Sequence, residues 1–354
     1  MEKNEYHVIG VMSGTSLDGI DLVQARFTYH GHWHFEILNA ETVDYNEDWR
    51  NTLGHLLSYE PEVLKEIDED YTKYLAGVIN QFIKTYNIKN IDMVCSHGHT
   101  ALHQPENNVT YQIGNLPALS KLLNKKVICD FRKQDVELGG QGAPLVPVGD
   151  KLLFSEYDYC VNLGGFANIS MDVNDVRVAY DICPVNIVLN HYVKQLGLNF
   201  DDKGQIASTG VIHTDMLNAL NDLDFYRAKY PKSLGLEWVK NHVLPLIDTY
   251  KLEVSDILRT FIEHMAIQIA SEIKEKINAL VLITGGGVYN TFLIEQLKRH
   301  SNQTIVIPSN EVIEFKEALI FGFLGVLKLR NEANCLQSVT GALKNHSSGT
   351  IFLP

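Results

Sequence analysis

The chain has 354 residues, more than one ordinary domain needs, so two packed domains are expected. Its hydrophobic content of 45%, with 21% charged residues, is typical of a globular protein with a proper core. No basic stretch offsets the net charge of −13 at pH 7, which argues against binding to nucleic acids or anionic membranes.

Cysteine usage and the N-terminal sequence bear on the compartment. Five cysteines are scattered along the chain without a C-x-x-C pair, which predicts reduced thiols. Residues 1–6 lack the apolar core of a signal peptide, and no apolar run reaches membrane-spanning length. These features predict a cytoplasmic protein.

The first predicted elements enclose a polar turn. An apolar strand over residues 6–12 runs into glycine and hydroxyl residues at 13–16, and a second apolar strand leaves from Ile20. Such a turn exposes several backbone N–H groups at once, and a nest of donors of this kind binds anions, phosphate above all. The alternative is a polar hairpin turn that its own hydroxyl groups cap.

Glycines and carboxylates in this turn add to the phosphate hypothesis. Gly14 and Gly19 can adopt positive φ and let a ligand approach the backbone closely. Asp18 and Asp21 are poorly placed to bind phosphate directly but well placed to hold a hydrated Mg²⁺ beside it.

The next elements alternate between strand and helix patterns. Residues 33–45 predict a third antiparallel strand, and residues 47–86 carry apolar side chains at helical spacing. Buried strands are predicted over 91–95 and 126–130. The glycine- and proline-rich stretch 138–144 is the candidate hinge between two domains.

The opening pattern then returns in the second half of the chain. A strand over 157–163, a turn at Gly164 and Gly165, and strands over 166–172 and 176–181 repeat the arrangement near residue 10. This weak internal symmetry predicts a duplicated fold.

A triple glycine marks a further candidate binding loop. The buried strand predicted over 280–284 ends in Gly285, Gly286 and Gly287 before a helix. A nucleotide base or ribose can lie there against bare backbone. Neither a Walker A motif nor G-x-G-x-x-G after a strand occurs, so P-loop and Rossmann sites are not expected.

Three charged residues stand at the ends of predicted elements. Arg132 follows a buried strand, where an α/β site would hold a carboxylate, although a surface ion pair with Asp135 is the alternative. Asp181 ends a strand and is poised as a general base. Glu317 is predicted to lie in the first turn of a helix. For both Asp181 and Glu317, the alternative to a functional role is that the carboxylate compensates a helix dipole.

Three histidines form the pattern H-x-H-x₃-H at His97, His99 and His103. A catalytic zinc ion takes three protein ligands plus water, so these side chains could form a metal site. No second cluster supplies a carboxylate or cysteine at a clear spacing. Loop histidines that hydrogen-bond to substrate or backbone are therefore favoured.

Motifs along the whole chain, in their family order, resemble the anhydro-N-acetylmuramic acid kinases. The motifs are Val11-Met12-Ser13-Gly14-Thr15-Ser16-Leu17-Asp18-Gly19-Ile20-Asp21, Ser96-His97-Gly98-x-Thr100, Gln112-Ile113-Gly114, Asp130-Phe131-Arg132-x-x-Asp135, Gly139-Gly140-Gln141-Gly142-Ala143-Pro144-Leu145-Val146-Pro147, Asn162-Leu163-Gly164-Gly165-x-Ala167-Asn168, Gly285-Gly286-Gly287-x-x-Asn290, Glu317-Ala318 and Ser338-Val339-Thr340-Gly341-Ala342. The resemblance implies an α/β, two-domain, actin-like (ribonuclease H-like) ATPase fold with ATP in the cleft between the domains.

The resemblance also implies how the site is divided. A domain over 1–140 would carry the first phosphate hairpin and the sugar-binding loops. A domain over 141–354 would carry the second phosphate hairpin, the catalytic aspartate and the adenosine loop. ATP would be bound by Gly14, Thr15, Ser16, Leu17, Asp18, Gly19, Ile20, Asp21, Asn162, Gly164, Gly165, Asn168, Gly285, Gly286 and Gly287. Asp18 and Asp21 would hold Mg²⁺ through water.

The family's substrate is 1,6-anhydro-N-acetylmuramic acid, a bicyclic sugar from cell-wall turnover. By resemblance, Asp181 would activate a water that attacks the anomeric carbon, while the freed O6 takes the γ-phosphate of ATP. Thr100 and Arg132 would grip the sugar, with Glu317 nearby. ATP and the anhydro sugar are thus the expected partners, with no nucleic acid and no membrane, and a homodimer is one option for assembly.

The sequence departs from the family's usual pattern at three places. Residues 181–186 read Asp-Ile-Cys-Pro-Val-Asn where the family usually has Asp-Thr-Gly-Pro-Gly-Asn. His99 replaces a usual glutamine, and Leu236 stands where arginine is common. Two alternatives stay open: a non-catalytic or specificity-shifted sugar or nucleotide sensor on the same fold, and a hydrolase that depends on a histidine-bound metal.

Overall fold

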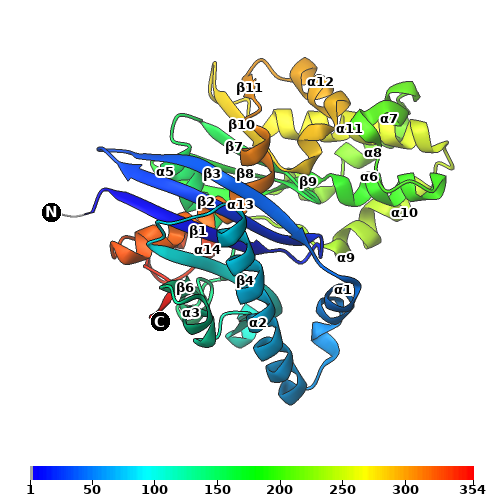
Figure 1. Cartoon of the computed structure of the whole chain (residues 1–354). Helices are drawn as coiled ribbons and strands as arrows, with labels where there is room; N and C mark the ends of the chain where they lie inside the picture. Colours follow the sequence, from blue (N-terminus) through cyan, green and yellow to red (C-terminus); the bar gives the residue numbers. More distant parts are fainter. Residues whose placement is uncertain (1–2) are drawn as a thin grey trace. The chain divides into compact units, whose positions relative to one another are not determined.

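A computed structural model describes residues 3–354, which form two compact units (Figure 1). The first unit combines Met1–Leu153 with Phe315–Pro354, and the second is Phe154–Glu314. The boundary expected between residues 140 and 141 differs from this division, because the C-terminal part of the chain returns to the first unit. No local pattern announces such a long-range return.

The first unit is built on a seven-stranded sheet. Its strands are β1 (Glu5–Ser13), β2 (Gly19–Tyr29), β3 (Trp33–Asp44), β4 (Met93–Gln104), β5 (Val109–Ile113), β6 (Val127–Cys129) and β12 (Thr350–Phe352). The order is β12-β6-β4-β1-β2-β3, with β5 paired to β4. Strands β1, β2 and β3 form an antiparallel meander, and β4 and β6 continue the sheet from β1 in parallel.

The second unit repeats this arrangement in a five-stranded sheet. Its strands are β7 (Tyr159–Leu163), β8 (Phe166–Val173), β9 (Val176–Pro184), β10 (Leu280–Thr284) and β11 (Thr304–Val306). The order β11-β10-β7-β8-β9, with the same parallel and antiparallel pairings, matches β6-β4-β1-β2-β3 of the first sheet. The predicted duplication is therefore confirmed, and each unit has the ribonuclease H-like topology of actin-like ATPases.

Helices of the first unit cover the sheet. They are α1 (Glu47–Gly54), α2 (Pro61–Thr85), α3 (Ala118–Leu123), α4 (Lys133–Glu137), α5 (Val146–Leu153), α13 (Asn310–Leu329), which belongs to this unit from Phe315 on, and α14 (Gln337–Thr340). The helical pattern expected over 47–86 is interrupted before Pro61. A new helix starts there, because proline lacks an N–H but suits the first helical turn.

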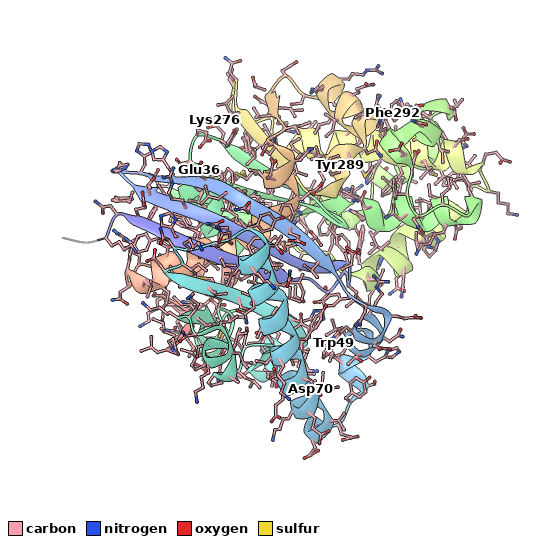
Figure 2. All side chains as sticks on the ribbon, viewed as in Figure 1. Glu36, Trp49, Asp70, Lys276, Tyr289 and Phe292 are labelled. Atoms are coloured by element: carbon pink, nitrogen blue, oxygen red, sulfur yellow. The ribbon has the colours of Figure 1, made fainter. Side chains whose placement is uncertain are left out.

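The two faces of the first sheet are covered by different helices. Ile9 of β1 shares a buried core with Tyr71 and Leu75 of α2, and Trp49 of α1 lies beside α2 with its ring 5.3 Å from that of Tyr71 (Figure 2). Successive residues of a strand point to opposite faces. Accordingly Gly10, the next residue of β1, faces α13.

Helices of the second unit surround a buried central helix. They are α6 (Asn186–Val193), α7 (Gln205–Thr209), α8 (Thr214–Asn221), α9 (Leu236–Trp238), α10 (Leu244–Asp248), α11 (Val254–Glu272) and α12 (Thr291–His300). Helix α11 buries Phe261, Ile262 and Met265 in the same core as Val161 of β7. The helix is buried on nearly all sides although it is not apolar all round, because buried polar residues such as Thr260 and His264 have hydrogen-bond partners in the same unit. Within residues 3–354, no helix has both the length and the apolar composition that a membrane crossing needs.

The glycine-rich loop over 138–144 is not the hinge that its composition predicts. It lies inside the first unit. The Gly142 N–H donates to Asp135 Oδ2 at 2.8 Å, and the Gln141 N–H donates to the Thr340 carbonyl at 2.8 Å. These bonds hold the loop onto neighbouring segments of the same unit, and the change of unit comes later, after Leu153.

Replacement of Gly10 by alanine should destabilise the protein. A Cβ there would lie 2.0 Å from the Ala318 carbonyl oxygen, so β1 and α13 would have to separate. Overpacking of this kind costs about 1–3 kcal/mol of unfolding free energy. Gly77→Ala is the matched control: its Cβ would meet nothing within 4 Å in α2, and alanine should gain up to about 1 kcal/mol there. Urea unfolding would measure the unfolding free energy of both variants and of the parent. A Gly10→Ala variant as stable as the parent would contradict the proposed packing.

Candidate functional site

The turn between β1 and β2, the first hairpin, is polar and open to solvent. Thr15, Ser16 and Asp18 are exposed, and the Leu17 N–H donates to the Gly14 carbonyl at 3.3 Å. Positive φ falls on Leu17 at +62°, and neither Gly14 nor Gly19 uses the positive φ that is open to glycine. A bulky residue with positive φ is strained, and strain of this kind is concentrated at functional sites.

Glycine is found at positions 14 and 19 of this hairpin for different physical reasons. At Gly19 a Cβ would lie 2.6 Å from the Val43 carbonyl oxygen, so close strand packing requires glycine. At Gly14 a Cβ would meet only the Ser16 side chain, at 3.4 Å. Neither packing nor φ requires glycine at position 14, whereas close approach of a ligand to the backbone would.

The two carboxylates predicted to hold Mg²⁺ differ in their surroundings. Asp18 is exposed in the turn, whereas Asp21 is half-buried on β2 and accepts a hydrogen bond from Thr42 Oγ1 at 2.6 Å. Both offer carboxylate oxygen, the ligand that Mg²⁺ takes beside a phosphate. Their assignment as magnesium ligands stays a prediction.

A buried hydroxyl cluster lies directly beneath the first hairpin. Ser13 Oγ is 2.5 Å from the Tyr45 hydroxyl and 2.8 Å from His99 Nδ1, and the Tyr45 and Tyr71 hydroxyls are 2.7 Å apart. Burial lowers the pKa of His99 to about 4, so its ring is neutral at pH 7. The cluster supports the base of the hairpin. Ser13 and His99 belong to patterns found in the sequence, whereas Tyr45 and Tyr71 do not.

Arg132 is held in one orientation by the β4 strand and the glycine-rich loop. Its Nε donates to His97 Nε2 at 2.8 Å, and its Nη1 donates to the Gly142 carbonyl at 2.7 Å. The guanidinium also lies over the Phe321 ring, 5.9 Å from its centre. Within residues 3–354 no hydrogen bond uses Nη2, which leaves its donors for a ligand.

His97 can accept from Arg132 only in its neutral form. Its Nδ1 donates to the Gly98 carbonyl at 2.8 Å, which leaves Nε2 as the acceptor. Burial, and then the Arg132 charge, hold the pKa of His97 well below its ordinary value. Sequence analysis did not identify His97 as the positioning partner of Arg132, since their contact spans 35 residues of sequence.

Glu317 and Thr100 complete the candidate sugar-binding group of the first unit. Much of the Glu317 side chain is accessible to solvent. The density of protein atoms around it raises its pKa, which the Arg132 charge opposes and the Asp21 charge reinforces. Thr100 is half-buried on β4, opposite Gln112 of β5. The structure thus places Arg132, Glu317 and Asp21 within electrostatic reach of one another.

The three histidines do not form the metal site considered from their spacing. His97 uses both ring nitrogens for Gly98 and Arg132, His99 contacts Ser13, and His103 Nδ1 lies 3.0 Å from Thr110 Oγ1. A break in the β1–β4 register passes through this segment. Among the described residues, these histidines are in no group of potential metal ligands.

The second hairpin, between β7 and β8, holds the start of α6. The Gly164 N–H donates to the Phe166 carbonyl at 3.1 Å, and the Val185 N–H donates to the Gly165 carbonyl at 2.8 Å. Gly165 is exposed, and a Cβ there would meet nothing within 4 Å. As at Gly14, the fold itself leaves room for a side chain.

The triple glycine lies against this second hairpin. A Cβ at Gly285, where φ is +84°, would lie 2.6 Å from Asn162 Oδ1, and one at Gly287 would lie 2.7 Å from Leu163 Cβ. Gly286 is exposed and meets nothing within 4 Å. Two of the glycines thus serve close backbone packing, and the middle one offers bare backbone to a ligand.

Asp181 lies at a bulge near the end of β9. Pairing with β8 shifts between Ala167 and Asn168, and such bulges re-aim side chains beside active sites. Its Oδ2 accepts from the Leu234 N–H at 2.7 Å, while Oδ1 takes no hydrogen bond from residues 3–354. Burial raises the pKa of Asp181, and the Leu234 bond opposes this only in part. Leu234 was not predicted, because it lies 53 residues away in sequence.

Comparison with known proteins places the chain among enzymes of one kind. A family model described as anhydro-N-acetylmuramic acid kinase matches residues 6–354. The protein of that name from Sulfurimonas denitrificans is 30% identical over 97% of this chain and 98% of its own length. The one from Pseudoalteromonas translucida is 33% identical over 94% of each chain. A solved activator of 2-hydroxyisocaproyl-CoA dehydratase from Clostridium difficile aligns over 92% of this chain and 97% of its own, with a TM-score of 0.45 and 13% identity, too distant to bear on function.

His99→Gln should make the protein less sensitive to acid. In the unfolded chain His99 binds a proton below about pH 6.5, whereas in the folded protein it does so only near pH 4. The free energy of unfolding therefore falls as the pH drops from 6.5 toward 4. At pH 5 this linkage costs about 2 kcal/mol of unfolding free energy. Glutamine does not titrate, so the stability difference between pH 7.5 and pH 5 in urea unfolding should shrink by 1–2 kcal/mol, on the order of that linkage. The exposed-site control His30→Gln should leave the difference unchanged, and an equal effect of both variants would refute the assignment.

Proposed function

The chain belongs to the anhydro-N-acetylmuramic acid kinase family, and on that premise we propose which of its residues perform the reaction. The chain is a carbohydrate kinase: ATP phosphorylates 1,6-anhydro-N-acetylmuramic acid as water opens the anhydro ring. The product is N-acetylmuramic acid 6-phosphate. The observation that carries this conclusion is the family match over residues 6–354.

We infer that the two glycine hairpins bind the phosphates of ATP. Gly14 and Gly165 support this, because the fold requires glycine at neither position while a closely approaching phosphate would. Gly286 supports an adenosine site for the same reason. Asp18 and Asp21 would hold Mg²⁺ through water, and the ion would neutralise the phosphate charge that grows during transfer.

Arg132 is proposed to bind the lactyl carboxylate of the sugar. The hydrogen bonds to neutral His97 and to the Gly142 carbonyl fix the guanidinium plane, so little side-chain entropy is lost when a carboxylate binds. The donors of Nη2 face no competing partner among residues 3–354. Thr100 and Glu317 are proposed to contact the sugar hydroxyl and amide groups.

Asp181 is proposed as the general base. A 1,6-anhydro sugar has no free O6 hydroxyl, so a base at this position can act only on water. Asp181 Oδ1 would take a proton from water as the water oxygen bonds to C1. The C1–O6 bond then breaks, O6 bonds to the γ-phosphorus, and ADP leaves. The Leu234 N–H bond to Oδ2 would aim the other carboxylate oxygen at the water.

The departures at residues 182–185 support an unchanged substrate over the sensor alternative. Ile182, Cys183 and Val185 are at most 1% exposed and lie in the core of the second unit. Side chains that point into the core add nothing to the surface beside Asp181. We also propose a cytoplasmic location, which the five free cysteines support, and leave assembly as a homodimer untested.

Arg132→Ala should weaken sugar binding and spare ATP. A substrate carboxylate that loses its charged partner loses about 1.5–3 kcal/mol of binding, so KM for the anhydro sugar should rise roughly ten- to hundredfold. Calorimetric ATP affinity should stay the same. Arg26→Ala, which removes an exposed arginine paired with Glu36 on the same sheet, is the control and should leave KM unchanged. An unchanged KM in Arg132→Ala would remove Arg132 from the site.

Asp181→Asn should abolish turnover while ATP still binds. Loss of a general base costs about 10²–10⁴ in rate. In ¹⁸O-water the parent enzyme should place the label on the anomeric hydroxyl, as mass spectrometry before mutarotational exchange would show. Because burial raises the pKa of Asp181, the acid limb of kcat/KM should lie above 3.8, its ordinary value. Asp224→Asn, fully exposed, is the control. Label in the phosphate group would show that ring opening does not use water as proposed.

A further inference from the structure

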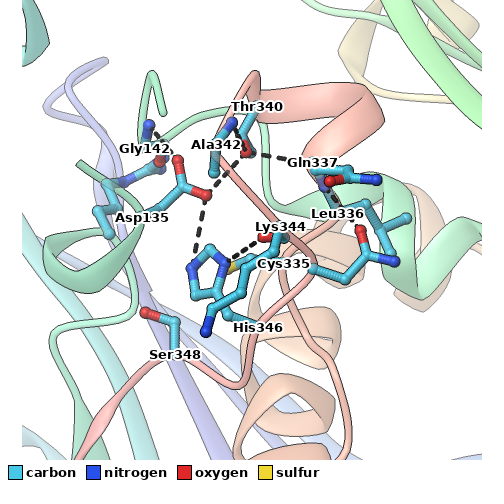
Figure 3. Close-up of polar contacts among 12 residues, drawn as sticks. Asp135, Gly142, Cys335, Leu336, Gln337, Thr340, Ala342, Lys344, His346 and Ser348 are labelled. Carbon is cyan, nitrogen blue, oxygen red and sulfur yellow. Dashed lines mark hydrogen bonds and ion pairs between the residues drawn. The ribbon is translucent and has the colours of Figure 1, made fainter. Parts of the chain in front are cut away.

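An aspartate, a cysteine and a histidine that the proposed reaction does not use lie together in the first unit (Figure 3). Asp135 is on α4, and Cys335 and His346 flank α14 in sequence. One carboxylate oxygen, Sγ and one ring nitrogen lie within 4.8 Å of one another. All three side chains are buried, and each offers one atom that can bind a metal ion.

The backbone holds these three residues in place without a ligand. The Cys335 N–H donates to the His346 carbonyl at 3.1 Å, and the His346 N–H donates back at 3.2 Å. Directly opposed residues of an antiparallel pair place their side chains on the same face. Asp135 is fixed separately, since its Oδ2 accepts from the Gly142 N–H and its Oδ1 accepts from Thr340 Oγ1 at 2.7 Å. The cluster is therefore preorganised.

One atom of the cluster lacks the partner that its chemistry demands. His346 Nδ1 is 3.0 Å from the Lys344 carbonyl, which can only accept, so Nδ1 carries the ring proton. In a neutral ring Nε2 is then a bare acceptor. It is buried without a hydrogen-bond partner and lies 3.5 Å from Asp135 Oδ1, another acceptor. Two lone pairs that face each other in the interior repel, and a cation bound by both would relieve this repulsion.

The separation distinguishes two candidate cations, a second ring proton and a metal ion. A hydrogen bond between a protonated ring and a carboxylate brings N and O to about 2.7–3.2 Å. Two ligands of one tetrahedral Zn²⁺, with bonds of about 2.0–2.2 Å, lie about 3.3–3.5 Å apart. The observed 3.5 Å between His346 Nε2 and Asp135 Oδ1 fits the metal better.

We propose that Asp135, Cys335 and His346 form a site for a Zn²⁺-class divalent transition-metal ion. Mixed sulfur, nitrogen and oxygen ligands suit Zn²⁺ and Co²⁺ and exclude Mg²⁺. Binding releases the Cys335 thiol proton to solvent, while His346 would bind through the lone pair of Nε2 and Asp135 through a carboxylate oxygen. A water or the hydroxyl of Ser348, which is buried without a hydrogen-bond partner, completes four ligands.

The ion would act as a structural clip. It joins the C-terminal segment over 335–346 to α4, and Arg132 is the residue that caps the start of α4. The Asp135 side chain also holds Gly142, whose carbonyl accepts from Arg132. A metal ion bound by Asp135 therefore stabilises α4 and the glycine-rich loop, the two segments that position Arg132, without contacting substrate.

The test is metal binding to the chelator-treated full-length protein. One equivalent of Co²⁺ should bind and give the visible bands of tetrahedral cobalt together with a thiolate-to-cobalt charge-transfer band in the near ultraviolet. Excess Zn²⁺, at about a hundred times its Kd, should bleach these bands and raise Tm by about 3–4 °C. No stoichiometric uptake by the parent protein would overturn the proposal and leave a protonated His346–Asp135 ion pair in its place.

Variants identify the ligands. Cys335→Ser should remove the charge-transfer band, and His346→Gln should weaken Co²⁺ binding at least a hundredfold. Cys129→Ser is the matched control, because Cys129 is buried in the same unit, outside the cluster, with Sγ 3.6 Å from the Asn115 carbonyl. Circular dichroism would confirm folding, and His346→Gln decides the matter should Cys335→Ser misfold. Unchanged Co²⁺ binding in folded His346→Gln, or an equal loss in Cys129→Ser, would overturn the assignment.

Discussion

The close contact between β1 and α13 determines where most of the first unit's functional groups lie. Because Gly10 has no side chain, the helix backbone at Ala318 can approach the strand directly. The strand then continues into the first hairpin, and the helix carries Glu317 and Phe321 to the vicinity of Arg132. A larger residue at position 10 would move both sets of groups apart. The geometry around Arg132 therefore rests on a glycine that touches none of it.

Burial controls the charge of the candidate groups in both units. In the first unit it keeps His97 neutral, and only a neutral ring can accept the Arg132 hydrogen bond. In the second unit it raises the pKa of Asp181, which brings a carboxylate closer to the basicity that proton abstraction needs. The overall charge of −13 plays no part in either effect. The same physical cause thus acts on the residue proposed to position the sugar-binding arginine and on the proposed general base.

Periodicity and glycine placement were sufficient to predict the strand–turn–strand repeat, whereas the α/β fold class was implied by the family resemblance. Phosphate binding by the two hairpins stays a prediction. These features are local: alternation marks a strand, and small residues between strands mark a tight turn. The same local rules correctly placed Arg132 and the triple glycine after strands. They ended a strand at Asp181, whereas β9 continues to Pro184. They did not indicate that Leu17 would be the residue with positive φ in the first turn.

Tertiary structure alone decided which distant segments meet. The return of Phe315–Pro354 to the first unit, the His97 contact to Arg132 and the Leu234 contact to Asp181 all join residues far apart in sequence. It likewise separated the histidines whose spacing resembled a metal site, and it assembled Asp135, Cys335 and His346, which share no motif. The sequence by itself determined the elements, the turns and the family. Long-range packing determined the partners, because side-chain contacts across a fold leave no periodic trace in the chain.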